Sequence, residues 1–139
     1  MTEKTFVDSN VLIYAHDLDA GSKQANAAGR LRELWERRAG CLSAQVLQEF
    51  YVNVTAKIRM PLPKGIAREV LRNYGVWVES FINPGTVVRA SEISEIWQIS
   101  FWDSMILASA EEARAEVVLT EDLSHGQIIA GIRIENPFA

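Results

Sequence analysis

Four acidic residues stand at positions where a folded chain could bring them together for metal chemistry. Asp8 and Asp122 each follow a short β-rich run, and Asp103 and Glu49 lie in stretches with helical periodicity. Carboxylate oxygens are preferred ligands of Mg²⁺ and Mn²⁺, and like charges held close together are costly unless a cation neutralises them. If the fold gathers these acids, the sequence predicts a site for a divalent cation.

A divalent cation at such a site can polarise a phosphate oxygen and activate water at neutral pH, which is the chemistry of phosphodiester hydrolysis. Metal-free routes have less support. His16 and His125 have no patterned acid or base partner, and Cys41 stands in an apolar segment without an evident base. The chain also lacks a Gly-x-Ser-x-Gly elbow and a phosphate-cradling glycine motif. The metal route is therefore the favoured interpretation.

The elements that must position the acids are short strands separated by longer helices. We expect strands at five β-rich runs, 5–7, 40–43, 86–88, 116–120 and 132–135. Apolar residues recur at helical spacing in three other stretches, 25–35, 46–58 and 66–81. Most connections are too long for hairpins, so they predict crossovers and a mainly parallel sheet of about five strands with helices on both faces. Since no repeat or linker divides residues 1–139, we expect one α/β domain.

Sites in open α/β sheets form outside the carboxyl ends of the strands. Asp8 and Asp122 both follow strands and therefore belong to that edge. Glu49 lies about a turn and a half into the helix after the second strand, which also leaves from this edge. Asp103 requires its helix to begin there, as a crossover helix should.

Two neighbouring acids compete for one of these positions, because Glu121 directly precedes Asp122. In an extended chain the side chains of Thr120 and Asp122 point to one side, and that of Glu121 points to the other. We therefore assign the site to Asp122.

Each acid also has a purely structural alternative. Asp8 and Asp122 could cap the helices that follow them, and Asp103 could belong to a capping box opened by Ser100. Glu49 could lie on a solvated helix face, as single glutamates usually do. Capping and metal binding are compatible, since helix N-termini favour carboxylates.

The composition predicts a cytoplasmic globular protein without a membrane segment. Its 139 residues are 48% hydrophobic and 23% charged, and the start of the chain lacks the apolar stretch of a secretory signal. The formal charge is −4, but with the four acids set aside the 18 acidic residues fall to 14 and match the 14 basic ones. The net charge therefore argues only weakly against a nucleic-acid substrate.

Four segments form an ordered pattern that spans most of the chain. They read FVDSNVL at 6–12, QEF at 48–50, FWDSMILASA at 101–110 and LTEDLSHG at 119–126. In this order they resemble the PIN-domain ribonucleases, and most closely the VapC-type toxins of bacterial toxin–antitoxin pairs. Each segment alone is a weak match, whereas the ordered set is specific.

This resemblance implies a role for each acid. Asp8 and Asp103 match the principal metal ligands, and Asp122 matches a third acid that contacts the metal directly or through water. Glu49 matches the acid that positions a second ion or its water. The implied cofactor is Mg²⁺ or Mn²⁺, bound as one ion or two.

The resemblance also implies supporting residues, a substrate and partners. Asn10 and Thr120 match polar residues that orient the carboxylates. The family acts as endoribonucleases on structured RNA, and its toxins are inhibited by a small cognate antitoxin and are commonly dimeric. We therefore expect an RNA substrate, an antitoxin partner and a homodimer.

Basic side chains could supply contacts to RNA. Lys64, Arg68 and Arg72 recur every four residues and form one stripe along the third helical stretch, which could hold phosphates. The alternative is an ordinary solvated face with a salt bridge or two. Three aromatic residues at helical spacing are more typical of a core or a dimer interface than of base stacking: Tyr74, Trp77 and Phe81.

Two other functions remain open at this point. A chain that keeps this scaffold could bind a protein partner without cutting RNA. A phosphatase of the doubly wound type would use an Asp nucleophile after the first strand. Such enzymes usually need a second acid two positions later, where this chain has Asn10.

Overall fold

The structure, a computed structural model that describes residues 3–139, is built on a five-stranded sheet. The strands lie in the order β2-β1-β3-β5-β4. Their bounds are β1 Thr5–Val7, β2 Gly40–Cys41, β3 Val117–Leu119, β4 Ile128–Ile129 and β5 Ile132–Glu135. The first four strands in this order run parallel, and β4 pairs antiparallel with β5. The predicted mainly parallel sheet is confirmed.

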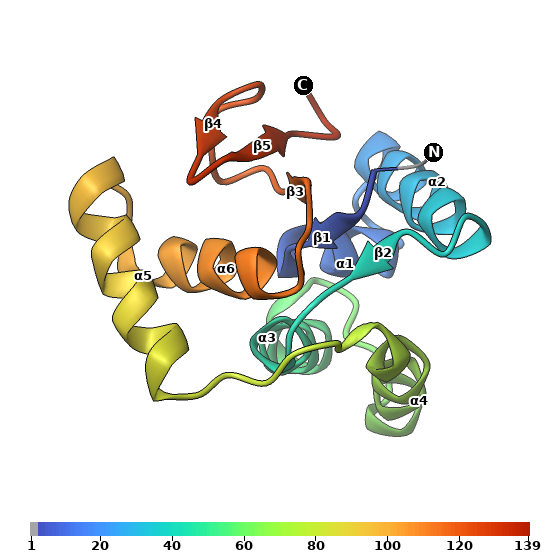
Figure 1. The fold of residues 1–139 in the computed structure, drawn as a ribbon. Coiled ribbons are helices and arrows are strands. Elements are labelled where there is room, and N and C mark those ends of the chain that lie inside the picture. The colour runs from blue at the N-terminus through green and yellow to red at the C-terminus, as the bar shows by residue number, and fades with distance from the viewer. Residues whose placement is uncertain (1–2) are drawn as a thin grey trace.

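Six α-helices surround this sheet in the described part of the chain. Their bounds are α1 Ser9–Ala15, α2 Ser22–Glu36, α3 Ala44–Val52, α4 Lys64–Tyr74, α5 Pro84–Trp97 and α6 Phe101–Glu112. A π-helical turn, Asn53–Lys57, continues α3, and a 3₁₀ turn, Gly75–Trp77, continues α4. In Figure 1, α5 and α6 lie together at the left of β1, α2 lies at the right, and α3 and α4 lie below. Helices therefore pack against the sheet from opposite sides.

The central strands are apolar because both of their faces are covered. Every residue of β1 and of β3 is buried. Phe6 of β1 pairs with Val118 of β3, and fully buried side chains of the helices complete the core, such as Leu12, Phe50 and Leu107. Fully burying side chains of this size stabilises the fold by roughly 1.5–3 kcal/mol each. The carboxyl ends of the strands are thus held on a rigid base.

The strand predicted at 86–88 is wrong, because these residues lie in α5. Asn83 caps this helix by accepting the backbone N–H of Thr86 at 3.2 Å, and the hydroxyl of Thr86 accepts the backbone N–H of Asn83 in return. Pro84 takes the first position of the helix, where its missing N–H is not needed. This capping box outweighs the β-propensity of the Thr-Val-Val run.

The fifth strand is instead β4, which the sequence did not predict. It has two residues and joins β5 through Ala130 and Gly131, both of which have positive φ angles (51° and 79°). Two residues with positive φ form the tight turn typical of a β-hairpin. Periodicity cannot identify a strand this short.

The third helical stretch is shorter than predicted. Its α-helix ends at Tyr74, and the chain then turns through Trp77. Leu42 and Val78 form an isolated parallel bridge, so the segment after this turn lies beside the end of β2. Phe81 stands in the following connection with 80% of its surface exposed, and it belongs neither to the helix nor to the core.

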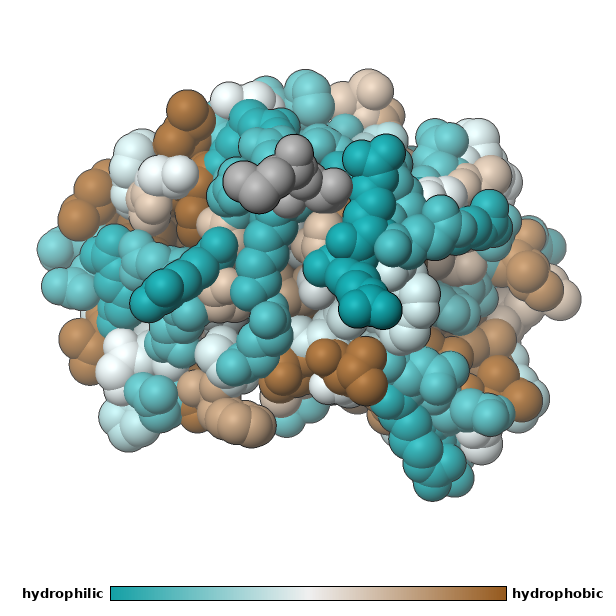
Figure 2. All heavy atoms as spheres, turned by 45° about the vertical axis from the view of Figure 1, so that its right-hand side comes forward, coloured by the Kyte–Doolittle hydropathy of each residue, from teal (hydrophilic) through white to brown (hydrophobic). Residues whose placement is uncertain are grey.

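The face of the molecule drawn in Figure 2 is mainly hydrophilic, and the hydrophobic side chains on it form small separate patches. Among residues 3–139, no helix is long and apolar enough to cross a membrane.

Candidate metal centre

Asp8 lies at the carboxyl end of β1 and is almost completely buried, with 4% of its surface exposed. Its Oδ1 accepts the backbone N–H of Ser9 at 2.7 Å, so the carboxylate caps α1. Its Oδ2 accepts the hydroxyl of Thr120 at 2.9 Å. The cap therefore exists, and it fixes the carboxylate at the edge where a metal is expected.

The environment of Asp8 disfavours its charged form. Burial raises its pKa from 3.8 to about 7, although hydrogen bonds from Thr120 and Ser9 oppose this shift. The negative charges of Asp122 and Glu49 also contribute to this rise. The carboxyl group is thus harder to ionise at neutral pH than an exposed aspartate, and a nearby cation would favour its ionised form.

Asp103 lies in the first turn of α6. Ser100 caps this helix by accepting the backbone N–H of Asp103 at 3.1 Å, so the cap uses the backbone and leaves the carboxylate available. Asp8, Asp103 and Asp122 each place one carboxylate oxygen so that the three oxygens lie within 4.8 Å of one another. Helix α6 therefore begins at the carboxyl edge of the sheet, beside the ends of β1 and β3.

Asp122 and its neighbour Glu121 point to different sides of the turn after β3. Oδ2 of Asp122 accepts the side-chain amide of Asn10 at 3.1 Å, and burial raises the pKa of Asp122. Glu121 instead accepts the hydroxyl of Tyr14 at 2.8 Å and the ammonium group of Lys23 at 3.1 Å. The structure thus places Asp122 in the acidic cluster and Glu121 outside it.

Asn10 and Thr120 connect the acids to one another. Nδ2 of Asn10 donates to the hydroxyl oxygen of Thr120 at 3.2 Å as well as to Asp122. Thr120 donates to Asp8 and accepts the backbone N–H of Asp122 at 3.1 Å. Position 10 therefore serves as a hydrogen-bond donor to a carboxylate, which differs from the second acid that a phosphatase of the doubly wound type would need.

Glu49 lies on α3 beside the three-acid group but not within it. The hydroxyl of Ser9 donates to its Oε2 at 3.0 Å, and the amide of Gln45 donates to its Oε1 at 3.0 Å. Its side chain therefore faces the carboxyl edge instead of a freely solvated helix face. Sequence reasoning missed Ser9 and Gln45. The signals that could have found them are the adjacency of Ser9 to Asp8 and the four-residue spacing between Gln45 and Glu49.

The donor set of this cluster fits a hard divalent cation. Three carboxylates converge, and oxygen ligands of this kind are those that Mg²⁺ and Mn²⁺ prefer. Asp8 is buried without a cationic partner among the described residues, so its ionised form is costly until a cation neutralises it. Thr120 and Asn10 orient the carboxylates, as outer partners of metal ligands usually do.

The predicted basic stripe lies on the surface of α4. Lys64, Arg68 and Arg72 are all exposed, and none of them forms an ion pair within residues 3–139. The salt bridges expected of an ordinary solvated face are thus missing there. Trp77, in contrast, is buried and packs edge-to-face on Tyr74 with ring centroids 5.1 Å apart, as expected of a core residue.

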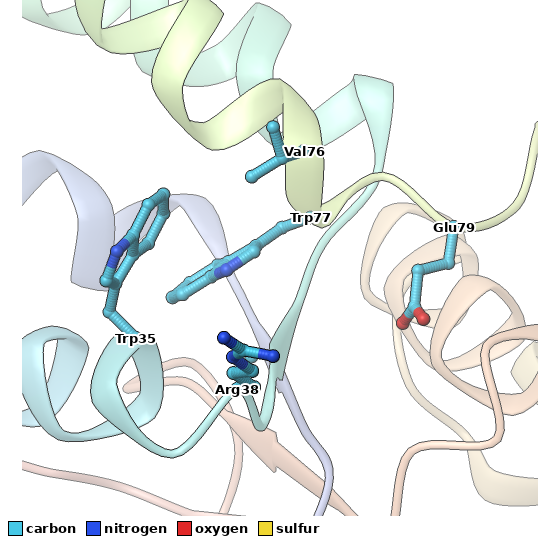
Figure 3. Close-up of a pocket in the computed structure, with 6 residues that line it drawn as sticks. Trp35, Arg38, Val76, Trp77 and Glu79 are labelled. Carbon is cyan, nitrogen blue, oxygen red and sulfur yellow. The ribbon is translucent and has the colours of Figure 1, made fainter.

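A separate hollow of about 360 Å³ lies at the opposite end of β2, and none of the cluster acids lines it. Figure 3 shows the Trp77 indole in its middle, with Trp35 beside it, Arg38 beneath it and Glu79 further away. A Cβ atom on Gly40 would lie 2.6 Å from the Trp77 ring, so only glycine fits there. This aromatic hollow is therefore a packing feature separate from the acids.

Comparisons with known proteins agree with this architecture. A family model described as "PIN domain" matches residues 5–128. The structure titled "Toxin-antitoxin complex from Klebsiella pneumoniae" is similar with a TM-score of 0.67 and 19% identity, over 96% of this chain and 97% of that chain. The structure titled "Crystal structure of VapBC2 from Rickettsia felis bound to a DNA fragment from their promoter" has a TM-score of 0.59 and 18% identity, over 95% and 97%. At these identities the likeness is one of fold alone. No curated protein sequence matches the chain.

Proposed function

Because the chain belongs to the PIN-domain family, we propose that it is a divalent-metal-dependent endoribonuclease. The observation that carries this proposal is the convergence of Asp8, Asp103 and Asp122 at the carboxyl edge of the sheet, with three carboxylate oxygens within 4.8 Å of one another. The family consists of nucleases, so the fold and the acids support the same chemistry.

In this proposal Asp8, Asp103 and Asp122 hold Mg²⁺ or Mn²⁺. Such an ion supplies charge stabilisation at a phosphate oxygen and lowers the pKa of a bound water. Thr120 and Asn10 keep the carboxylates oriented. Glu49, which Ser9 and Gln45 hold from two sides, orients water beside the reacting phosphate.

The proposed substrate is RNA, held in part by the basic stripe of α4. Lys64, Arg68 and Arg72 are exposed and unpaired in the described part of the chain, and phosphate contacts from such side chains bind nucleic acid without reading its sequence. The charge of the stripe is local, because the whole chain carries −4.

We further infer that the protein is the toxin of a toxin–antitoxin pair, acts in the cytoplasm as a homodimer, and is inhibited by a cognate antitoxin. The two similar solved structures are titled as a toxin–antitoxin complex and a VapBC complex, and each aligns over nearly its whole chain. The motif pattern at 6–12, 48–50, 101–110 and 119–126 supports the same assignment.

The decisive experiment is the mapping of RNA ends in cells after brief induction of the wild-type chain or of Asp8→Asn. New 5′ ends that appear only with the wild type would identify both the activity and the RNA. In vitro, purified protein freed of any partner should cleave that RNA with Mn²⁺ and stop when a chelator is added. Equal cleavage by wild type and Asp8→Asn, or cleavage in chelator, would overturn the proposal.

A non-catalytic binding module is the main rival, and it predicts a different result. Such a protein would have no need to bind a metal ion at the acids. Absence of Mn²⁺ binding by the purified wild-type chain in calorimetry would therefore favour this rival over the nuclease.

A further inference from the structure

The turn that carries Asp122 is held from its outer side as well as from the metal site. The carboxylate of Glu121 accepts the Tyr14 hydroxyl on Oε1 at 2.8 Å and the Lys23 ammonium group on Oε2 at 3.1 Å. Each oxygen of Glu121 thus has its own donor. We call Tyr14, Lys23 and Glu121 the outer clamp.

Helix α1 takes part in both sides of this arrangement. Asn10 and Tyr14 are four residues apart, so their side chains lie on one face of the helix. Asn10 accepts the backbone N–H of Glu121 at 3.3 Å and donates to Asp122 at 3.1 Å, while Tyr14 donates to the side chain of Glu121. One helical turn of α1 therefore determines the direction of two successive side chains in the turn after β3.

Lys23 links the outer clamp to two further parts of the chain. It lies in the first turn of α2, with Nζ 4.7 Å from the centroid of the Tyr14 ring and 5.3 Å from that of Phe138. The Tyr14 and Phe138 rings pack edge-to-face at 5.1 Å. The ammonium group thus lies over two rings and beside one carboxylate, which restricts where the Glu121 side chain can go.

We propose that Lys23 and Tyr14 are positioning residues of the metal site, which hold Glu121 outward so that Asp122 presents its carboxylate to Asp8 and Asp103. The proposal rests on the proposed metal-binding function. Two adjacent acids on one turn can exchange places through a local change of the backbone, and a free Glu121 would compete with Asp122 for the cation. The outer clamp removes that competing arrangement.

Removal of Lys23 has opposite expected effects on metal affinity, depending on whether the lysine acts through its charge alone or through positioning. A lysine near an acidic cluster repels a divalent cation, so its replacement by a neutral residue should tighten metal binding. Loss of positioning should instead weaken binding, because the three carboxylates would no longer converge. The sign of the change therefore separates the two explanations.

The test is a calorimetric titration with Mn²⁺ of the wild type and of Lys23→Met, Lys23→Arg and Tyr14→Phe. We expect Lys23→Met to weaken Mn²⁺ binding about tenfold, at the low end for loss of an outer partner of a metal site. Tyr14→Phe should weaken it less, and Lys23→Arg, which keeps the charge and a donor, should bind nearly as the wild type does. The side-chain amide signals of Asn10 in NMR spectra should shift in Lys23→Met.

Lys4→Met is the matched control. It removes the same kind of Lys–Glu pair, since Lys4 lies 2.6 Å from Glu79, but at the amino ends of the strands. Its Mn²⁺ affinity should equal that of the wild type. Unchanged or tighter binding in Lys23→Met would overturn the inference while leaving the proposed function intact, whereas a wild type that binds no Mn²⁺ would overturn the function itself. If Lys23→Met fails to fold, Tyr14→Phe decides: weaker Mn²⁺ binding supports the inference, and unchanged or tighter binding overturns it.

Discussion

Carboxylates near the two ends of the parallel strands have different kinds of partner. At the carboxyl ends, the carboxylate of Asp8 receives hydrogen bonds from neutral donors, such as the hydroxyl of Thr120. At the amino end of β1, the ammonium group of Lys4 lies 2.6 Å from the carboxylate of Glu79. The carboxylate of Asp8 thus has no basic partner in the described part of the chain, whereas the carboxylate of Glu79 is neutralised by a lysine.

Two other acids at the carboxyl edge, Glu121 and Glu135, follow the second pattern. Glu121 is paired with Lys23, and Glu135 at the end of β5 is paired with Arg30 at 3.0 Å. At this edge, basic partners are thus found at Glu121 and Glu135, whereas Asp8 and the neighbouring Glu49 receive hydrogen bonds from neutral donors. The difference lies in burial together with pairing: Asp8 is buried and has only neutral donors, whereas Glu121 and Glu135 have basic partners.

The largest expected effect comes from removing a cluster acid. Asp103→Asn should lower the rate of metal-dependent RNA cleavage about a thousandfold or more, as expected when a charge-stabilising group is lost. The fold should survive, because the cap of α6 uses the backbone N–H of residue 103. Cleavage rates at saturating Mn²⁺ measure the effect. Glu79→Gln at the opposite end serves as the control and should cleave normally; equal rates in both variants would abolish the contrast between the two ends.

The stability of the metal-free protein should depend on the ionisation of Asp8. Its folded-state pKa of about 7 is raised by burial above its ordinary value of 3.8, so the contribution is fully present below about pH 3.8 and is lost as pH rises through about 7. As the pH rises through this window, the free energy of unfolding of the wild type should thus fall by roughly 2 to 4 kcal/mol relative to that of Asp8→Asn. Urea denaturation in chelator at pH 5 and pH 8 tests this. Parallel pH profiles of the two proteins would contradict it, and added Mn²⁺ should restore the wild type at pH 8.

The hollow at the amino ends should matter for packing alone. Gly40→Ala places a Cβ atom 2.6 Å from the Trp77 ring, and overpacking of this kind costs about 1–3 kcal/mol. Thermal unfolding should show the loss, while Mn²⁺ affinity of the folded variant stays unchanged. Gly65→Ala, where the added Cβ meets no atom within 4 Å, is the matched control. Weaker Mn²⁺ binding in Gly40→Ala would show that the two ends of the sheet are coupled.

The smallest effect should come from the basic stripe. Replacing Lys64, Arg68 and Arg72 together by Gln should weaken RNA binding. The slope of log K against log [salt] should become shallower by about two, because each phosphate contact on a single strand contributes about 0.7. Mn²⁺ affinity should not change, since the stripe lies outside the cluster. Filter-binding titrations of Asp103→Asn, with and without the three substitutions, give the slope without cleavage. An unaltered slope would remove α4 from the RNA contacts.

The convergence of the acids could be predicted from sequence because one rule of topology applies to them. Asp8 and Asp122 follow strands that pair with each other in parallel, so their convergence follows from the order of the elements. The direction of Glu121 could be predicted from the alternation of side chains. Its partner Lys23 could not, because 98 residues separate the two and no local pattern joins them.

The errors in the predicted fold also have local causes. The run at 86–88 has β-branched residues, but the capping box between Asn83 and Thr86 makes it helical. Strand β4 has only two residues, and it exists because a hairpin turn brings it onto β5. In both cases local hydrogen bonds to the backbone determine the structure, and the spacing of apolar residues does not reveal such bonds.

The hydrogen bond between Asp8 and Thr120 joins residues that lie 112 positions apart. During synthesis Asp8 leaves the ribosome long before β3, the strand that precedes Thr120. A growing chain that ends before β3 has neither Asp122 nor the hydroxyl that orients Asp8. The complete cluster can thus form only after β3 and the turn that follows it have been made, and the order in which the chain is made delays its assembly until these strands can pair.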